Sequence, residues 1–225
     1  MALALKFNFI ELVIGQPWSA HASADQPIGH VQEQAVESSL PDQELAAAVI
    51  TDPEAFLPLF QRYYPRILNY LYRRTMQLEL AEDLTSKTFL AAYEDLRRTK
   101  RSLNFRPWIY RIATNVHLSH TRRRQRWLKR IMEIGRQFKT TESPSHNSVE
   151  HEEMALVRRE LVALPEKYRS VLILRYDESF SYEEIVESLG ISPTAARTRV
   201  SRGLAMLKKR LAQSKISDEK NPANE

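Results

Sequence analysis

The chain of 225 residues contains no cysteine. This absence excludes a disulfide framework, a thiolate metal site and a cysteine nucleophile, and it is compatible with a reducing compartment. No apolar run reaches the length of a membrane-spanning helix. The apolar start MALALKFNFIELVIG is interrupted by Glu11, and Lys6 is the only basic residue before it. We therefore expect a flexible extension or an over-long start, and not a secretion signal.

Signatures of catalysis are also missing. The sequence has no Walker loop, no HExxH motif and no persuasive group of metal-binding carboxylates. His117 and His120 with a distant acid would form only a poor metal site, and we interpret both as surface histidines. We therefore expect no catalytic residue, no metal and no cofactor. A hydrolase or nuclease acting on nucleic acid is the alternative from another functional class.

Positive charge is unevenly distributed along the chain. The formal net charge of +5 is modest. One cluster is Arg122-Arg123-Arg124-Gln125-Arg126 with Lys129 and Arg130, and a second lies between Arg197 and Arg210. Two separate basic patches suit a polyanion that is contacted at two places.

The second cluster lies within a predicted helix-turn-helix, in the segment SYEEIVESLGISPTAARTRVSRGLAMLKK. An acidic helix over residues 182–189 is followed by Gly190, which can end a helix in the left-handed conformation. Ser192 can cap the next helix, and Pro193 fits its first position. An acidic helix, a glycine turn and a basic helix predict a unit that fits the DNA major groove.

The apolar residues of the basic helix recur at intervals of four and three and predict one buried stripe: Ala196, Val200, Leu204, Leu207 and Leu211. Other side chains then point away from this stripe: Thr194, Ala195, Thr198, Ser201 and Arg202. Arg197 and Arg199 lie on its flanks, where guanidinium groups reach phosphates. The alternative is a surface helix whose arginines are merely solvated.

The periodicity predicts an all-α protein with two small helical domains joined by a flexible linker, the second containing the helix-turn-helix. Even the apolar run VLIL at 171–174 is flanked by helical patterns, so we expect a helix there. The expected divisions are a disordered extension at 1–40, a first domain at 41–127, a linker at 128–150, a second domain at 151–213 and a disordered tail at 214–225.

Five motifs in this order resemble the bacterial RNA polymerase sigma factors of the compact, extracytoplasmic-function type. They are DPEAFLPLFQRYYPRI, AEDLTSKTFLAAYEDL, FRPWIYRIATNVHLSHTRRRQR, LPEKYRSVLILRY and SYEEIVESLGIS. Each motif is weak alone, but the combination is specific, and it covers about residues 41–211. No central domain fits between residues 126 and 152, as in the compact subtype.

The resemblance implies a first domain that binds core polymerase and the −10 promoter element, and a second that binds the −35 element. Polymerase contact falls on Glu82, Asp83 and Leu84. Contact with the −10 element, including strand opening, falls on Lys100, Arg101, Asn104, Phe105, Trp108, Arg111, Asn115, His120, Arg122, Arg123 and Arg124. Contact with the −35 element falls on Thr194, Arg197, Thr198, Arg199, Ser201 and Arg202.

Several simpler interpretations stay open. Core packing would explain Trp108 and Tyr110. A helix start, where the helix dipole favours acids, would explain Glu82 and Asp83. The arginine cluster could be a solvated helix end. An ordinary transcription regulator would have the same helix-turn-helix, but it would not need FRPWIYRIATN followed by arginines. The sequence also departs from the family pattern at Lys87, Ser119, Thr194 and Ala196, which weakens any transfer of a promoter sequence.

The partners implied by the resemblance are core RNA polymerase and promoter DNA, with an anti-sigma factor as a further candidate. The expected location is the cytoplasm, without membrane insertion.

Overall fold

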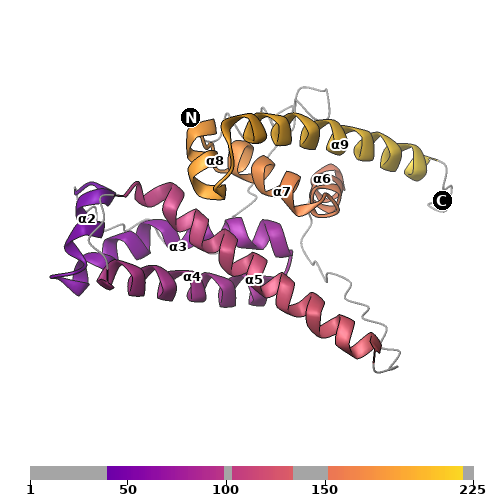
Figure 1. The fold of residues 1–225 in the computed structure, drawn as a ribbon. Coiled ribbons are helices and arrows are strands. Elements are labelled where there is room, and N and C mark those ends of the chain that lie inside the picture. The colour runs from indigo at the N-terminus through magenta and orange to yellow at the C-terminus, as the bar shows by residue number, and fades with distance from the viewer. Residues whose placement is uncertain (1–39, 99–102, 134–151, 220–225) are drawn as a thin grey trace. The chain divides into compact units, whose positions relative to one another are not determined.

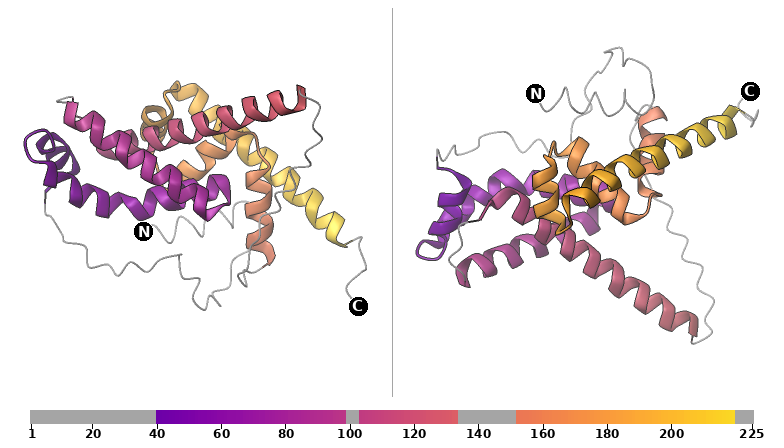
Figure 2. Two further views of the ribbon diagram at one scale, coloured as in Figure 1. Left: turned by 90° about the horizontal axis from the view of Figure 1, so that it is seen from below. Right: turned by 45° about the horizontal axis from the view of Figure 1, so that its top comes forward.

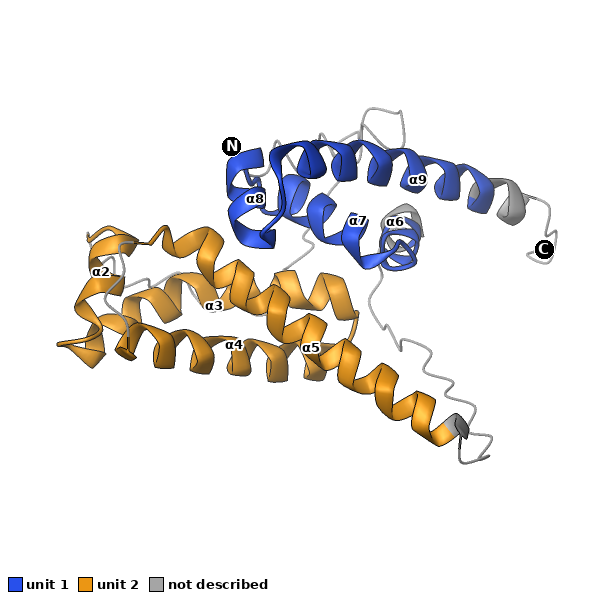
Figure 3. Cartoon of the chain, in the orientation of Figure 1, with its two compact units in different colours: residues 1–34, 148–225 blue, residues 35–147 orange. Residues whose placement is uncertain are grey.

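The computed structural model describes residues 40–98, 103–133 and 152–219, and no strand occurs in these ranges. The described residues form two compact units (Figure 3), an N-terminal unit of residues 40–133 and a C-terminal unit of residues 152–219. The prediction of an all-α protein with two helical domains is confirmed.

The N-terminal unit contains α2 (Asp42–Ala48), a 3-10 turn (Pro53–Ala55), α3 (Phe56–Thr75), α4 (Leu78–Arg98) and α5 (Phe105–Glu133). The views in Figures 1 and 2 show α3, α4 and α5 alongside one another, and the last turns of α5 extend beyond the other two. The start of this bundle follows from local chemistry, because the Asp52 carboxylate accepts a hydrogen bond from the backbone N–H of Glu54 at 3.0 Å. Helix α3 ends at Met76, which takes the left-handed conformation with φ 54°.

Apolar side chains at helical spacing form the core of this unit. The fully buried members include Leu59, Ile67 and Leu71 of α3, Leu84 of α4 and Ile109 of α5. An aromatic group adds to the contact between α3 and α4. It comprises Phe56, Phe60, Tyr64, Phe89 and Tyr93, whose paired ring centroids lie 4.9–6.2 Å apart.

The C-terminal unit contains α6 (Glu152–Val162), α7 (Glu166–Leu172), a π-helical turn (Ile173–Asp177), α8 (Tyr182–Leu189) and α9 (Pro193–Glu219). The predicted helical state of residues 171–174 is confirmed, as the end of α7 followed by the π turn. Helices α6, α7 and α8 all pack against α9. The long α9 is therefore the element on which this unit is built.

Two helices are longer than the sequence predicted. Helix α5 continues through Glu133, past the domain boundary placed at residue 127, and α9 continues through Glu219, past the start of the predicted tail. The segments 127–133 and 214–219 contain no glycine or proline, so nothing in them ends a helix. The predicted extension up to residue 39, most of the predicted linker and residues 220–225 lie outside the described residues.

One position of the predicted α9 stripe is wrong. Four of the predicted stripe residues are buried: Ala196, Val200, Leu207 and Leu211. Leu204 is only half-buried, and the buried residue between Val200 and Leu207 is Gly203 instead. A Cβ atom at Gly203 would lie 3.3 Å from Cγ and Cδ1 of Leu172. The close approach of α7 to α9 therefore uses a residue without a side chain, which an apolar count cannot detect.

Candidate nucleic-acid interface

The helix-turn-helix is formed by α8, Gly190 and α9. Helix α8 begins with a capping box, in which Ser181 Oγ accepts from the Glu184 N–H at 3.1 Å and the Ser181 N–H donates to Glu184 Oε2 at 2.8 Å. It ends at Gly190, which has φ 61° and ψ 41° as predicted. Both ends of α8 are thus fixed by local chemistry, and they set the direction in which the chain enters α9.

Helix α9 begins at Pro193, as predicted, and Ser192 Oγ accepts a hydrogen bond from the Ala195 N–H at 3.2 Å. Its buried stripe faces α7, and the polar residues at its start lie on the other side. Thr194, Arg197, Thr198, Ser201 and Arg202 are exposed, and Arg199 is half-buried. The first turns of α9 therefore present a contiguous polar and basic face with no acidic residue in it.

The sequence prediction did not include Tyr182, which lies beneath this face. The guanidinium carbon of Arg197 lies 5.7 Å from the centroid of the Tyr182 ring, and that of Arg175 lies 5.0 Å from it. Arg175 also donates to the carbonyl oxygen of Phe180 at 2.7 Å. One aromatic ring thus joins α8 to the π turn and to the basic helix.

Charge at the start of α8 complements these arginines. The pKa of Glu183 is lowered, chiefly by its backbone hydrogen bond, then by a hydrogen bond with Ser181, and further by attraction to Arg197 and Arg175. The acidic start of α8 therefore experiences the positive charge of Arg197 and Arg175.

In the N-terminal unit, α5 carries most of the predicted −10 residues. Arg111, Asn115 and Arg122 are exposed and Trp108 is half-buried. At 100° per residue these four side chains lie within an arc of about 60° along one side of the helix. His120 is half-buried on another side, and the predicted residues Arg123 and Arg124 are also exposed.

Two of the predicted contact residues are core residues. Phe105 is fully buried at the start of α5, with its ring centroid 5.1 Å from that of Tyr63 and 5.5 Å from that of Trp108. Leu84 is also fully buried, whereas Glu82 and Asp83 beside it are exposed. Their apolar side chains reach the interior because of where they lie on their helices. Asn104 is exposed, and Lys100 and Arg101 lie outside the described residues.

Lys87, one of the departures from the family pattern, lies on the same helix as Glu82 and Asp83. Its ammonium group lies 2.5 Å from a carboxylate oxygen of Asp83, and both side chains are about half exposed. This ion pair between residues i and i+4 partly neutralises the acidic start of α4.

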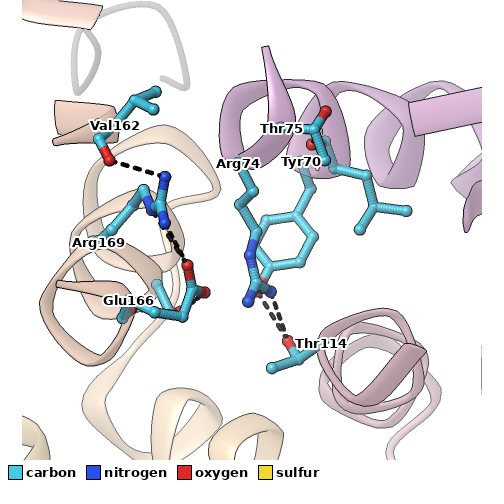
Figure 4. A network of polar contacts seen from close by, with 9 residues as sticks. Tyr70, Arg74, Thr75, Thr114, Val162, Glu166 and Arg169 are labelled. Carbon is cyan, nitrogen blue, oxygen red and sulfur yellow. Dashed lines mark hydrogen bonds and ion pairs between the residues drawn. The ribbon is translucent and has the colours of Figure 1, made fainter. Parts of the chain in front are cut away.

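A buried polar network that no sequence signal indicated joins α3 to α5 (Figure 4). Arg74 is 2% exposed and donates to Tyr70 Oη at 2.7 Å and to Thr114 Oγ1 at 3.2 Å, and the two hydroxyls lie 2.8 Å apart. Tyr110 packs edge-on against Tyr70 at 5.0 Å, which confirms the packing interpretation of Tyr110. The network therefore joins the buried sides of α3 and α5 through hydrogen bonds.

A separate network lies within the C-terminal unit, also shown in Figure 4. Arg169 donates to Glu166 Oε2 at 2.7 Å and to the carbonyl oxygen of Val162 at 2.9 Å. It links the end of α6 to α7. Glu160 makes a second link, accepting from Arg210 at 2.8 Å and from Ser214 at 3.0 Å, and so holds α6 against α9.

The two histidines do not form a shared site. His117 is buried, at 6% exposure, so its interpretation as a surface residue is wrong. It lies on the core side of α5, as Ala113 does four residues earlier. Across the described ranges no three potential ligands gather as they would around a metal ion, and no helix there is long and apolar enough to cross a membrane.

The chain resembles known proteins over both units. It matches the family descriptions Sigma-70 region 2 over residues 59–127 and Sigma-70, region 4 over residues 154–207. RNA polymerase sigma factor YlaC of Bacillus subtilis is 35% identical over 70% of this chain and 92% of its own length. The ECF RNA polymerase sigma factor SigW of the same organism is 30% identical over 71% of this chain and 90% of its own length.

Among solved structures, the fold is similar to the sigma factor RpoE of Bartonella quintana, crystallised in complex with the anti-sigma factor NepR. The TM-score is 0.57 at 21% identity, covering 71% of this chain and 98% of that one. The chain therefore belongs to the RNA polymerase sigma factors of the extracytoplasmic-function type, which bind core RNA polymerase and promoter DNA and direct promoter-specific initiation of transcription.

Proposed function

We propose that α9 reads the −35 element from the major groove, with its first turns against the base edges. The observation that carries this assignment is the exposed face of Thr194, Arg197, Thr198, Ser201 and Arg202 on a helix whose opposite side is buried. A guanidinium can donate two hydrogen bonds to guanine, and a hydroxyl can donate to or accept from base edges. Half-buried Arg199 lies at the edge of this face, where it suits a phosphate contact.

The −10 element and the opened strands are assigned to α5. Trp108, Arg111, Asn115 and Arg122 share one side of this helix, which offers an aromatic ring, an amide and two guanidinium groups. Arg123, Arg124 and His120 add charge and hydrogen-bonding capacity at the next turns. Opening DNA requires cations along the backbone and polar or aromatic partners for unpaired bases. Phe105 is not included because it is buried in the core.

Core polymerase is assigned to the exposed acids Glu82 and Asp83 at the start of α4. Leu84 supports this surface from inside the bundle and does not contact the polymerase. The boundaries of the two functional domains follow the two compact units, and the chain acts without catalytic activity of its own. Because it works with bacterial core polymerase, its place of action is the cytoplasm.

Regulation by an anti-sigma factor is also part of the proposal. The solved relative from Bartonella quintana was crystallised with such a partner. The partner would cover the exposed surfaces of α4 or α9 that polymerase and DNA otherwise use. Recovery of such a protein with the tagged chain from its own cells, and its displacement by core polymerase, would support this part.

The direct test is reconstitution with purified bacterial core polymerase. We expect the full chain to bind core polymerase and to direct run-off transcription from a subset of genomic fragments. The chain alone should neither transcribe nor cleave nucleic acid. A folded protein that does not bind core polymerase would contradict the proposal, and nucleic-acid cleavage without polymerase would instead support the hydrolase alternative.

A further inference from the structure

Helices α3 and α4 carry apolar side chains on the outer side of the N-terminal unit. Leu57 of α3 and Leu90 of α4 are 57% and 60% exposed. Three half-buried aromatic residues accompany them, Phe60 and Tyr64 on α3 and Tyr93 on α4. We name these five residues the α3–α4 apolar face.

A ring contact shows how the two helices form this face. Phe56 packs against Tyr93 at 5.2 Å, so the start of α3 lies beside the second half of α4. Leu57 and Leu90 each lie within one helical turn of this contact. Tyr63, which packs against α5, lies about 120° around α3 from Leu57. The exposed leucines therefore lie on the side of the helix pair that is turned away from α5.

The α3–α4 apolar face adjoins the site proposed for core polymerase. Within the described part of the N-terminal unit, no element covers Leu57 or Leu90. Asp83 lies two turns before Leu90 on nearly the same side of α4, and Glu82 lies beside it. A contiguous apolar face is unfavourable in water and marks an interaction site. Whatever covers this face also comes close to the two acids.

The chain itself supplies an apolar segment that suits this face. Residues 2–14, ALALKFNFIELVI, precede the described residues and contain only two charged side chains, Lys6 and Glu11. The large apolar side chains of this segment include Leu5, Phe7 and Phe9. Exposure of such a segment is unfavourable for the same reason as exposure of the face. Contact between the two removes apolar area of both from water.

The connection to the N-terminal unit allows this contact. The described chain begins at Leu40, and the Asp42 carboxylate accepts hydrogen bonds from Arg62 and Tyr63 of α3. Residues 15–39 join the segment to this point, and a coil of that length spans roughly 25–30 Å, about the length of α3. A tether of this kind gives an effective concentration on the order of millimolar. This favours the chain's own segment over a separate partner.

We propose that residues 2–14 dock on the α3–α4 apolar face and that core polymerase displaces them when it binds. Leu5, Phe7 and Phe9 supply the apolar contacts of the docked segment. The segment then lies beside Glu82 and Asp83 and hinders access to them. Docking does not depend on the proposed function, but the competition rests on it, because that function assigns the two acids to core polymerase.

The absence of cysteine makes disulfide trapping in the full chain a specific test of docking. Asn8→Cys places one thiol in the segment, and Ser86→Cys places another on the exposed side of α4, one turn before Leu90. The matched control pairs Asn8→Cys with Ser119→Cys, at an exposed serine of α5. Under mild oxidation in dilute solution, the first pair should close about tenfold faster than the second. Non-reducing electrophoresis over time measures both rates.

Two further variants show whether the apolar side chains are responsible. In the Asn8→Cys/Ser86→Cys chain, F7S/F9S should slow disulfide closure to near the rate of the control pair. L57S/L90S should do the same from the other side of the contact. Both leucines are exposed, so the fold should persist, which circular dichroism checks.

Competition is measured with chains that contain no added cysteine. If the segment covers the site for about 70–90% of the time, it lowers the apparent affinity for core polymerase about three- to tenfold. Equilibrium titration should therefore show that F7S/F9S binds core polymerase about three- to tenfold more tightly than wild type. The control I28S/V31S changes apolar residues between the segment and Leu40 and should bind like wild type.

Equal closure rates for the Ser86→Cys and Ser119→Cys pairs would overturn the docking inference. Covalent dimers in place of an internal disulfide would also overturn it, because a second copy would then occupy the face. Unchanged affinity of F7S/F9S for core polymerase would overturn the competition. If no variant bound core polymerase although the internal disulfide formed as expected, the proposed function would fail and docking would stand.

Discussion

At the scale of single residues, the Tyr182 ring holds Arg197, which we propose contacts DNA. Its ring lies beneath the guanidinium groups of Arg175 and Arg197, and only Arg197 belongs to the face assigned to the −35 element. A cation held over an aromatic ring loses part of its freedom before DNA binds. We therefore expect the ring to prepare Arg197 for the proposed contact with the −35 element.

Replacing this ring tests the role of Tyr182. Tyr182→Leu should weaken binding to the −35 element by about 0.5–1 kcal/mol, whereas Tyr182→Phe should bind like wild type, because the ring and not the hydroxyl contacts the arginines. Equilibrium titration of a duplex containing the element measures both variants. Equal weakening by Phe and Leu would assign the effect to the hydroxyl instead.

Glu160 links stability of the C-terminal unit to pH. Its burial opposes ionisation, but hydrogen bonds from Ser214 and Arg210 outweigh this, and the pKa of Glu160 is lowered overall. A carboxylate with a lowered folded-state pKa stabilises the fold at neutral pH. That contribution is lost as the pH falls from the ordinary value of about 4.3 through the folded-state pKa.

We therefore expect Glu160→Gln to lower the free energy of unfolding at pH 7 by about 1.5–3 kcal/mol, the range for hydrogen bonds to charged groups. The difference from wild type should shrink as the pH falls below about 4. Urea unfolding followed by circular dichroism at several pH values measures it. A difference that stays constant down to pH 3 would show that packing, and not the charge, is responsible.

At the scale of helices, the approach of α7 to α9 depends on Gly203. A valine there would place methyl groups against Leu172, which is buried and has little room to move. Gly203→Val should destabilise the C-terminal unit by about 1–3 kcal/mol. Ala205→Val, on the exposed side of α9, is the matched control for the helix preference of valine. Hydrogen exchange in α7 and α9 measures both, and equal protection in the two variants would contradict the prediction.

Helices were predictable where the sequence carries a local signal. Gly190, Ser192 and Pro193 fix the turn and the start of α9, and apolar spacing identified most of its buried stripe. The capping box of Ser181 and Glu184 could also have been found, because its spacing is a known signature. Local signals of this kind need no knowledge of the partner helix.

Contacts between helices were not predictable from one sequence. The burial of Gly203, and the bonds of Arg74 to Tyr70 and Thr114, depend on which helix lies opposite. The same reason explains Phe105, which was expected to contact DNA but packs against Tyr63 of α3. An aromatic residue beside a basic segment has the same appearance in sequence whether it faces solvent or the core.

At the scale of the whole molecule, two units each present a basic face on one long helix. In α5 and in α9 alike, one side is buried in its own unit and another exposes arginines. This arrangement explains why a modest net charge of +5 suffices for DNA binding, because the charge is concentrated where contact is expected. It also predicts that the two faces contribute separately to promoter use.

A double-mutant cycle tests this separation. Arg202→Ala in α9 should weaken −35 recognition by about 1–3 kcal/mol. The triple replacement of Arg122, Arg123 and Arg124 by alanine should reduce open-complex formation, while core polymerase binding stays nearly intact. Because three phosphate contacts are lost, the slope of log K against log salt concentration should become shallower by about two to three units. Because the two sets lie in separate compact units, their free-energy effects on promoter binding should add within about 0.5 kcal/mol. A coupling energy well above that value would mean that the two units recognise the promoter as one surface. If the triple variant lost core polymerase binding as much as it lost open-complex formation, the arginine cluster would belong to the polymerase interface.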